Sequence, residues 1–296
     1  MRRSLRLPAF AKINLCLDII GRRPDGYHEL RTIFQAISLH DTLELLLEPR
    51  QGIRLEVSDP ALPAGPDNLV SRSIAAIASE IGYSGGVRGR LEKRIPVARG
   101  LGGGSSDAAA ALIGMLRLTR KKLPLARLVE IAAGLGADVP FFLFGGRALA
   151  VSRGDEIYPL PDAPRRTILV VSPRDLGVST PEAYRWVSDE LTKRDKPPTI
   201  WKFCALCWSR WGTVSNDFEG PVFRRHPRLG EIRDALLRRG AAEAALAGSG
   251  SAVFGVFQNP AQARRAARDF SEDSVFVTET ISRERYGRAL GWRAAG

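Results

Sequence analysis

Apolar residues recur along the chain with two different spacings, which predict strands and helices in mixed order. Residues 5–20 are apolar and extended in character, and TLELLLE at 42–48 alternates so that Leu43, Leu45 and Leu47 share one face. In NLVSRSIAAIASEIG, residues 68–82, the apolar positions instead follow a helical spacing, and the segment ends at Gly82. We therefore expect strands in the first fifty residues and a helix after them.

The rest of the chain continues this mixed pattern. Strands are expected at 87–95, 141–151, 167–173, 252–257 and 274–280, and helices at 123–136, 181–191, 227–239 and from 260. A further helix is expected after the glycines at 100–104, capped by Ser105 or Ser106. Because helices and strands do not alternate regularly, the order indicates an α+β fold rather than a repeated βαβ unit.

The size of the chain indicates two domains. Its 296 residues, of which 44% are hydrophobic, are enough for two closely packed domains. The segment RGDEIYPLPDAPRR, residues 153–166, is polar and rich in proline, as domain boundaries often are. We place the boundary there and expect domains at 1–158 and 159–296.

The formal net charge of +12 would suit a polyanionic partner. The basic residues are spread over both halves, however, and aromatic residues make up only 7% of the chain, so the stripe of interleaved arginine and aromatic residues typical of nucleic-acid binding is missing. We expect small anions and no nucleic acid as ligands, with a basic RNA-binding protein as the alternative.

The sequence predicts neither a membrane span nor a secretion signal. No apolar run reaches ~18 residues, and Lys12 and Asp18 interrupt the apolar N-terminal stretch, which no small-residue cleavage site follows. Cysteine occurs three times, an odd and sparse set that is typical of a reducing compartment. We expect a cytoplasmic protein with no membrane partner.

Cys204 and Cys207 have the spacing of a zinc or redox pair. A zinc site needs a second pair of ligands, and the three histidines of the chain are not spaced to provide one. The surrounding WKFCALCWSRW, residues 201–211, carries its tryptophans at helical intervals. We expect a buried amphipathic helix there.

The segment GLGGGSSDAAAAL, Gly100 to Leu112, places four glycines within five residues. Without Cβ atoms the backbone can adopt positive φ, so its N–H groups can converge on one anion at the start of the following helix. A P-loop requires lysine after the last glycine and a dinucleotide-binding loop requires a further glycine, but Ser105 stands there. The segment predicts a phosphate site of another kind, and a tight turn with close helix packing is the alternative.

This segment resembles the central motif of the GHMP kinases, a family named for galactokinase, homoserine, mevalonate and phosphomevalonate kinases. Two further segments are similar to family motifs in the same order: PAFAKINLCLDI near the start and LAGSGSAVFGVF at 246–257. Within the family, AKINLCLDIIGRRPDGYHELRTIFQ at 11–35 and LGADVPFFLFGG at 135–146 resemble the branch that acts in the non-mevalonate isoprenoid pathway.

The resemblance implies a two-domain fold with an N-terminal α/β domain, a ferredoxin-like C-terminal domain and the active site in the cleft between them. It implies an ATP-dependent kinase that uses Mg²⁺ and phosphorylates the 2-hydroxyl of a small-molecule substrate, a cytidine-diphosphate-linked methylerythritol. A homoserine or mevalonate-type kinase is the alternative within the family, and PDGYHEL at 24–30 argues against it. No carboxylate cluster marks a metal cage, so the metal ligands stay open, with Ser106 as a candidate.

By the same resemblance, Asp138 accepts the proton of the substrate hydroxyl and Lys12 lies beside it. A carboxylate is ionised at neutral pH, and a neighbouring ammonium keeps it ionised and lowers the pKa of the attacking hydroxyl. Asn14 shares the face of Lys12 in a strand and would orient that hydroxyl. Taken singly, Asp138 could merely organise a turn before Pro140, and Lys12 could be a strand-edge charge.

The resemblance also assigns binding residues. The ATP phosphates are expected at Pro96, Val97, Ala98, Arg99, Gly100, Leu101, Gly102, Gly103, Gly104, Ser105 and Ser106. The substrate is expected at Tyr27 and His28 for the base, Lys93 on its base or ribose side, Tyr184 on its opposite face and Thr180 at its phosphate or polyol end. Arg99 stands where relatives have a small residue, and Ala247 where they have a hydroxyl, so both departures bear on ligand affinity.

Overall fold

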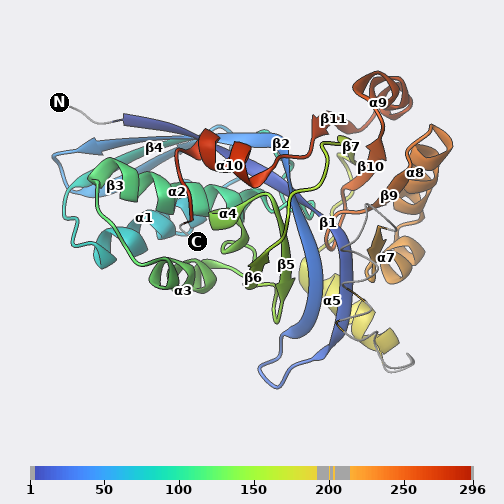
Figure 1. Cartoon of the computed structure of the whole chain (residues 1–296), viewed down its shortest axis with the longest axis horizontal. Coiled ribbons are helices and arrows are strands. Elements are labelled where there is room, and N and C mark those ends of the chain that lie inside the picture. The colour runs from blue at the N-terminus through green and yellow to red at the C-terminus, as the bar shows by residue number, and fades with distance from the viewer. Residues whose placement is uncertain (1–3, 192–199, 201–202, 204–213, 295–296) are drawn as a thin grey trace.

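The computed structural model describes residues 4–191, 200, 203 and 214–294. A seven-stranded sheet has the order β3-β4-β2-β1-β8, with β5 paired to β2 and to β6. Its strands are β1 (Ser4–Arg22), β2 (His28–Glu48), β3 (Gly52–Val57), β4 (Gly86–Glu92), β5 (Arg147–Val151), β6 (Glu156–Pro159) and β8 (Ser215–Asn216). The long antiparallel hairpin of β1 and β2 runs through the middle of the molecule (Figure 1).

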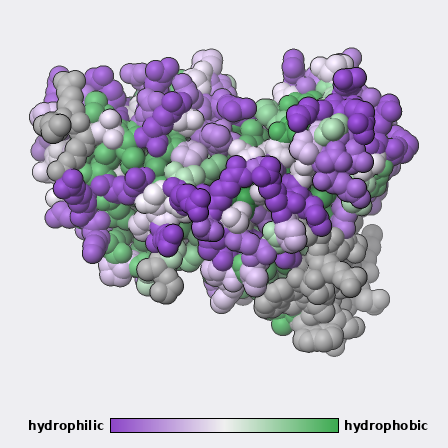
Figure 2. Space-filling view, turned by 45° about the horizontal axis from the view of Figure 1, so that its top comes forward, coloured by the Kyte–Doolittle hydropathy of each residue, from purple (hydrophilic) through white to green (hydrophobic). Residues whose placement is uncertain are grey.

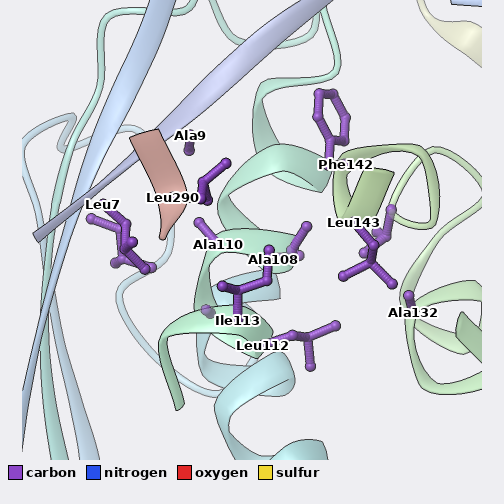
Figure 3. Close-up of a cluster of buried hydrophobic side chains, with 14 of the residues drawn as sticks. Leu7, Ala9, Ala108, Ala110, Leu112, Ile113, Ala132, Phe142, Leu143 and Leu290 are labelled. Atoms are coloured by element: carbon purple, nitrogen blue, oxygen red, sulfur yellow. The ribbon is translucent and has the colours of Figure 1, made fainter. Parts of the chain in front are cut away.

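Four helices share the core of the first half: α1 (Leu69–Glu80) and α2 (Gly103–Thr119) contact the strands, and α3 (Leu125–Leu135) and α4 (Phe141–Phe144) pack on α2. The helix α2 is almost entirely buried, and small side chains such as Ala108 and Ala110 let it approach the strands closely (Figure 3). At Gly114 even a Cβ atom would lie only 2.7 Å from Cδ1 of Leu45. The run of alanines after the glycines is therefore a packing requirement of the central helix.

The second sheet contains β7 (Thr167–Ser172), β9 (Glu243–Leu246), β10 (Val253–Phe257) and β11 (Ser274–Glu279), in the antiparallel order β11-β7-β10-β9. The helices α8 (Pro227–Arg238) and α9 (Pro260–Ala267) connect its strands, which gives the ferredoxin-like arrangement. α5 (Thr180–Leu191), α7 (Glu219–Arg225) and the short 3₁₀ helix Arg268–Phe270 complete this half. Hydrophilic side chains cover much of the face seen in Figure 2.

The strand β1 belongs to the cores of both halves. Leu7 and Ala9 lie in the cluster beneath α2, whereas Leu17 and Ile19 pack with β7 and β10 of the second sheet. Irregularities in the pairing of β1 with β2 occur between 10 and 11, 14 and 16, and 19 and 21, where the strand can bend. Residues 11–16 of β1 therefore lie where the two halves meet.

Three expectations from the sequence need correction. The segment 141–151 is not one strand: α4 occupies 141–144 and β5 begins only at Arg147, because short apolar runs do not distinguish helix from strand. Neither Ser105 nor Ser106 caps α2, which begins at Gly103 after Gly102 in the left-handed conformation. Cys16 is disulfide-bonded, which the sparse cysteine set did not predict.

Two further expectations are not settled. The segment 201–211, expected to form a helix, lies largely outside the described residues. The division into 1–158 and 159–296 stays a prediction: β6 ends at Pro159 and β7 begins at Thr167, but β8 pairs with β1. Among the described residues, no helix is both long enough and apolar enough to cross a membrane.

The helix α10 (Arg283–Leu290) returns to the first core, to which its residues Tyr286 and Leu290 belong. The Tyr286 ring is 2% exposed, contacts Phe10 at 5.3 Å between centroids, and donates its hydroxyl to the carbonyl oxygen of Phe142 at 2.7 Å. The ring fills the space beside Gly145, where a Cβ atom would lie 2.3 Å from it. Tyr286 thus completes the core that supports α4.

We expect Tyr286→Ala to lower the free energy of unfolding by about 3–5 kcal/mol, because it leaves a cavity of aromatic size. Tyr286→Phe should cost about 1–3 kcal/mol, because it leaves the buried Phe142 carbonyl without its donor. Urea denaturation measures both changes. Tyr158→Ala, which removes a tyrosine that is 52% exposed, is the matched control and should change stability by less than about 0.5 kcal/mol. Equal losses for Tyr286→Ala and Tyr158→Ala would contradict this account.

Candidate active site

A cleft of about 1460 Å³ opens where β1, the segment before α2, α5 and the turn between β9 and β10 come together. It brings together nearly every residue that the sequence singled out. The predicted residues that line it are Lys12, Asn14, Tyr27, His28, Lys93, Asp138, Thr180, Tyr184 and the run from Pro96 to Ser105. Ser106 is the exception, since it is 1% exposed and does not line the cleft.

Lys12 and Asp138 face each other in this cleft. Nζ of Lys12 lies 3.6 Å from Oδ2 of Asp138, donates to Oδ1 of Asn14 at 2.8 Å and lies 4.9 Å from the centroid of the Phe34 ring. The side chain of Lys12 is only 5% exposed, whereas that of Asp138 is 33% exposed. A buried ammonium therefore stands beside a carboxylate that a ligand can reach.

A chain of hydrogen bonds fixes Asn14 beside this pair. Nδ2 of Asn14 donates to Oγ1 of Thr32 at 2.8 Å, and the Thr32 hydroxyl donates to the carbonyl oxygen of Cys16 at 2.7 Å. Because Nδ2 is used in this way, Oδ1 is turned toward Lys12. Asn14 thus orients the ammonium.

The glycine segment lies against Lys12. The backbone N–H of Lys12 donates to the carbonyl oxygen of Leu101 at 3.0 Å, and a Cβ atom on Gly102 would lie 3.1 Å from Cγ of Lys12. Gly100 and Gly102 have φ values of +79° and +70°, whereas Gly103 already belongs to α2. The segment thus presents backbone N–H groups at the N-terminus of a 17-residue helix, an arrangement that can bind phosphate.

The second glycine segment, at 246–251, packs directly onto the first. A Cβ atom on Gly100 would lie 1.8 Å from the carbonyl oxygen of Ala247, so both segments need bare backbone at this contact. Arg99 joins them: its carbonyl oxygen accepts from the N–H of Ala252 at 3.2 Å, and its Nη1 donates to Oγ of Ser251 at 2.9 Å. The guanidinium of Arg99 is therefore engaged with protein groups.

Thr180 lies at the other side of this second segment. Its hydroxyl is 2.9 Å from the hydroxyl of Ser249, and both residues line the cleft. These two hydroxyl groups, one at the start of α5 and one in the β9–β10 turn, can together bind a polar end of a ligand.

Few side chains of the described residues can hold a metal ion. No group of three or more histidine, cysteine, aspartate or glutamate residues comes together in the described part of the chain. Oγ of Ser106 is buried without a hydrogen-bond partner under the glycine segment, and Asp138 offers the exposed carboxylate. This oxygen set fits Mg²⁺ only if a ligand's phosphate groups supply most of the coordination.

Lys93 lines the same cleft but at a different end from the other residues predicted to bind the substrate. It follows β4, where Glu92 pairs with Thr42, whereas His28 is at the opposite end of β2. Its ammonium is bonded to the carboxylates of Asp41 and Asp107, the latter at 2.7 Å, beneath the glycine segment. A Cβ atom on Gly103 would lie 3.3 Å from Nζ. Lys93 thus supports the start of α2.

Two carboxylates share this one ammonium in a buried site. Asp41 is fully buried and accepts a hydrogen bond from the N–H of Ile95 at 2.8 Å, while Oδ1 of Asp107 is buried without a partner. Burial raises the pKa of Asp107 to about 7, against the opposing effect of Lys93, and the negative charge of Asp41 adds to the rise. The neighbouring carboxylates raise the pKa of Lys93 despite its burial.

The aromatic residues gather at the far end of the cleft. The rings of His28 and Tyr184 are stacked with 4.6 Å between centroids and 21° between planes, and Phe218 meets Tyr184 edge-on at 4.9 Å. Nε2 of His28 lies 2.6 Å from Oγ of Ser188. Burial lowers the pKa of His28 and raises that of Tyr184.

This stacking changes the expected geometry of the base site. We expected a base between Tyr27 and Tyr184, but His28 already covers one face of Tyr184. The Tyr27 ring is 56% exposed and has the guanidinium of Arg153 4.9 Å from its centroid. Tyr27 therefore has the exposed ring, whereas one face of Tyr184 is already occupied by His28.

Sequence reasoning missed Asp41, Asp107 and Thr32. Asp107 lies within the segment GLGGGSSDAAAAL, and Asp41 is a charged residue within an apolar strand segment, so a signal was present for both. Thr32 gave none, because threonine is ordinary in strands.

Both halves of the chain match models of one protein family. Residues 68–146 match the GHMP kinases N terminal domain and residues 200–274 match the GHMP kinases C terminal domain. A 4-diphosphocytidyl-2-C-methyl-D-erythritol kinase from Solibacter usitatus is 45% identical over 99% of this chain and 93% of its own. A protein of the same name from Moorella thermoacetica is 43% identical over 94% of this chain and 99% of its own.

Solved structures agree with this likeness. A crystal structure of a 4-(cytidine 5'-diphospho)-2C-methyl-D-erythritol kinase has a TM-score of 0.78 and 38% identity over 93% of this chain and 99% of that one. A homoserine kinase from Cytophaga hutchinsonii has a TM-score of 0.70 at 19% identity, covering 94% and 95% of the two chains, and shares the fold.

The shared ammonium predicts an unusual pH dependence of stability. Because the pKa of Asp107 is about 7 in the folded state and about 4 when unfolded, the folded state binds more protons between these values. The free energy of unfolding should therefore fall as the pH rises through this window. Lys93 contributes no change there, because it remains protonated in both states.

We expect Asp107→Asn to remove this dependence, since the amide keeps an oxygen for Lys93 without the excess charge. Between pH 5 and pH 8 the wild type should lose about 1–3 kcal/mol more stability than the variant in urea denaturation. Asp175→Asn, which removes a carboxylate that is 76% exposed, should behave like the wild type. Parallel pH profiles for wild type and Asp107→Asn would show that Asp107 is ionised throughout.

Proposed function

The chain belongs to the GHMP kinase family, and we propose that it transfers a phosphoryl group from ATP to the 2-hydroxyl of 4-diphosphocytidyl-2-C-methyl-D-erythritol. The observation that carries this proposal is the placement of Lys12 and Asp138, 3.6 Å apart, in one cleft with the glycine segment. The choice of substrate is supported by relatives of that name, which are up to 45% identical over nearly the whole chain. The reaction belongs to the non-mevalonate route to isoprenoid precursors.

Asp138 is the general base of this proposal. Its partly exposed carboxylate accepts the proton of the attacking hydroxyl, while the buried ammonium of Lys12 stabilises negative charge on that oxygen. Asn14 acts through Lys12, because its amide oxygen fixes the direction of the ammonium. Phosphoryl transfer needs mainly such positioning and charge stabilisation.

The glycine segment from Pro96 to Ser106 binds the phosphates of ATP. Its left-handed glycines and the N-terminus of α2 offer N–H donors to anionic oxygens. Mg²⁺ neutralises charge on the transferred phosphoryl group when it is bound. Ser106 is our candidate for a protein ligand, since its hydroxyl is buried without a partner directly behind the residues that line the cleft.

The aromatic end of the cleft binds the cytidine. Tyr27 offers an exposed ring face for stacking, and His28, fixed between Tyr184 and Ser188, offers hydrogen bonds to the base. Tyr184 acts by holding His28, and Thr180 with Ser249 binds the phosphate or polyol end. We assign Lys93 to the end of the cleft that binds ATP, because it lies beneath the glycine segment.

The partner of this enzyme is a small molecule, and we expect it to act in the cytoplasm, where its nucleotide substrates are found. A homoserine or mevalonate-type kinase is the second candidate within the family, since a homoserine kinase shares the fold. An RNA-binding role has only the net charge of +12 in its favour.

An assay of ATP consumption across a panel of acceptors tests the proposal. The panel contains 4-diphosphocytidyl-2-C-methyl-D-erythritol, the same alcohol monophosphate without its nucleoside, homoserine and mevalonate. We expect strong preference for the cytidylyl compound. Equal turnover of the first two acceptors would refute the cytidine site, and preference for homoserine or mevalonate would move the chain to another branch. Salt-dependent RNA retention without ATP consumption would favour the RNA-binding role.

We expect Asp138→Asn to lower kcat by at least ~100-fold while the affinity for ATP and the thermal midpoint stay close to wild type, since losing a general base costs ~10²–10⁴ in rate. Single-turnover kinetics and calorimetric titration of ATP measure the two quantities. Asp175→Asn, at an exposed site outside the cleft, is the control. A kcat within a few-fold of wild type would remove Asp138 from the chemistry.

A further inference from the structure

The turn between β5 and β6 reaches the nucleoside end of the cleft with a residue that the proposed mechanism does not use. Arg153 and Gly154 in this turn line the cleft, as do Gly26, Tyr27 and His28 of the β1–β2 hairpin. The guanidinium carbon of Arg153 lies 4.9 Å from the centroid of the Tyr27 ring. Two loops that are distant in sequence therefore meet at one aromatic ring.

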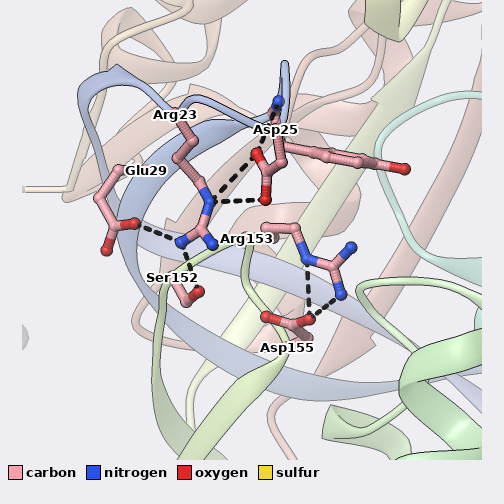
Figure 4. A network of polar contacts seen from close by, with 7 residues as sticks. Arg23, Asp25, Glu29, Ser152, Arg153 and Asp155 are labelled. Carbon is pink, nitrogen blue, oxygen red and sulfur yellow. Dashed lines mark hydrogen bonds and ion pairs between the residues drawn. The ribbon is translucent and has the colours of Figure 1, made fainter.

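The carboxylate of Asp155 anchors the guanidinium of Arg153. Its Nε donates to Oδ2 of Asp155 at 3.0 Å and its Nη2 donates to the same oxygen at 2.5 Å (Figure 4). The side chain of Asp155 is only 11% exposed. Asp155 thus holds the planar guanidinium of Arg153 in its position over the Tyr27 ring.

The turn itself is tied to the hairpin. The carbonyl oxygen of Ser152 accepts from the N–H of Leu30 at 2.8 Å. The Ser152 hydroxyl accepts from Nη1 of Arg23 at 2.9 Å (Figure 4). Arg23 also donates to Glu29 at 2.8 Å and pairs with Asp25 at 3.1 Å. The β5–β6 turn that carries Arg153 is therefore bonded to the β1–β2 hairpin, whose turn carries Tyr27.

We propose that Arg153 is a positioning residue for nucleoside recognition: anchored by Asp155, its guanidinium holds the ring of Tyr27 as one wall of the nucleoside end of the cleft. This inference rests on the proposed function, because it concerns the cytidine of that substrate. A ring that is 56% exposed at a hairpin tip would otherwise lose side-chain freedom when a base stacks on it. Holding the ring in advance removes that cost from binding.

Substitution of Arg153 should therefore affect substrate binding alone. Arg153→Leu should raise the KM for 4-diphosphocytidyl-2-C-methyl-D-erythritol about 2- to 5-fold, the range of an exposed cation–π contact, with kcat and the KM for ATP unchanged. Arg153→Lys, which keeps the charge, should recover part of the affinity. Arg90→Leu, on β4 outside the cleft, removes the same charge at a residue that is 63% exposed and should leave all constants unchanged.

A double-mutant cycle with Tyr27→Leu separates positioning from direct contact. In the Tyr27→Leu background, Arg153→Leu should have no further effect on this KM, because the ring through which it acts is gone. Additive effects would mean that Arg153 binds the substrate itself, and an unchanged KM in the single variant would mean that it does nothing. Either result overturns the proposal.

A second variant, Asp155→Asn, tests the anchor of Arg153 while leaving the guanidinium and the Tyr27 ring in place. Asp155→Asn weakens the anchor without altering Arg153 or Tyr27, and should raise the same KM in the same direction by a smaller factor. A wild-type enzyme that fails to use the cytidylyl acceptor would refute the proposed function, and this inference with it. A wild type that uses the acceptor, with Arg153→Leu and Asp155→Asn indistinguishable from it, would refute this inference alone.

Discussion

A buried ammonium at the junction of two hydrophobic cores is the constraint on which the cleft depends. Lys12 is 4% exposed, and burying a charge is costly unless polar groups surround it. Asn14, Asp138 and the face of Phe34 provide that surrounding, and each comes from a different part of the first half of the chain. The bond from the Lys12 N–H to Leu101 then ties the glycine segment to the same strand, so the position of the ammonium and the shape of the loop are linked.

The second buried ammonium plays a different part. Lys93 is shared by Asp41 and Asp107, which gives a site with one negative charge too many when both carboxylates are ionised. Burying these charges lowers the stability of the folded state. Replacing a buried charge cluster by apolar groups is often neutral or favourable for stability. The cluster of Lys93, Asp41 and Asp107 lies beneath the first turn of α2, where it fixes the backbone that carries the glycines.

Much of the fold and of the site could be predicted from the sequence, for identifiable reasons. Alternation at 42–48 and helical spacing at 68–82 correspond to β2 and α1, because each periodicity has a single geometric meaning. The glycine segment and the residues near Lys12 and Asp138 were found because their motifs are local in sequence. Pairings across the fold were not found: nothing local indicates that His28 stacks on Tyr184, or that Lys93 meets Asp41 rather than a ligand. At 141–144 an apolar run alone did not distinguish helix from strand.

The return of α10 to the first core has a consequence for biosynthesis. Domains generally fold as units from the N-terminus while the chain is still being synthesised. Here the aromatic ring that fills the space beside Gly145 is Tyr286, so the core around α2 and α4 lacks an internal part until synthesis has passed α10. The residues of the first half alone therefore cannot complete this core, and α10 supplies the missing ring.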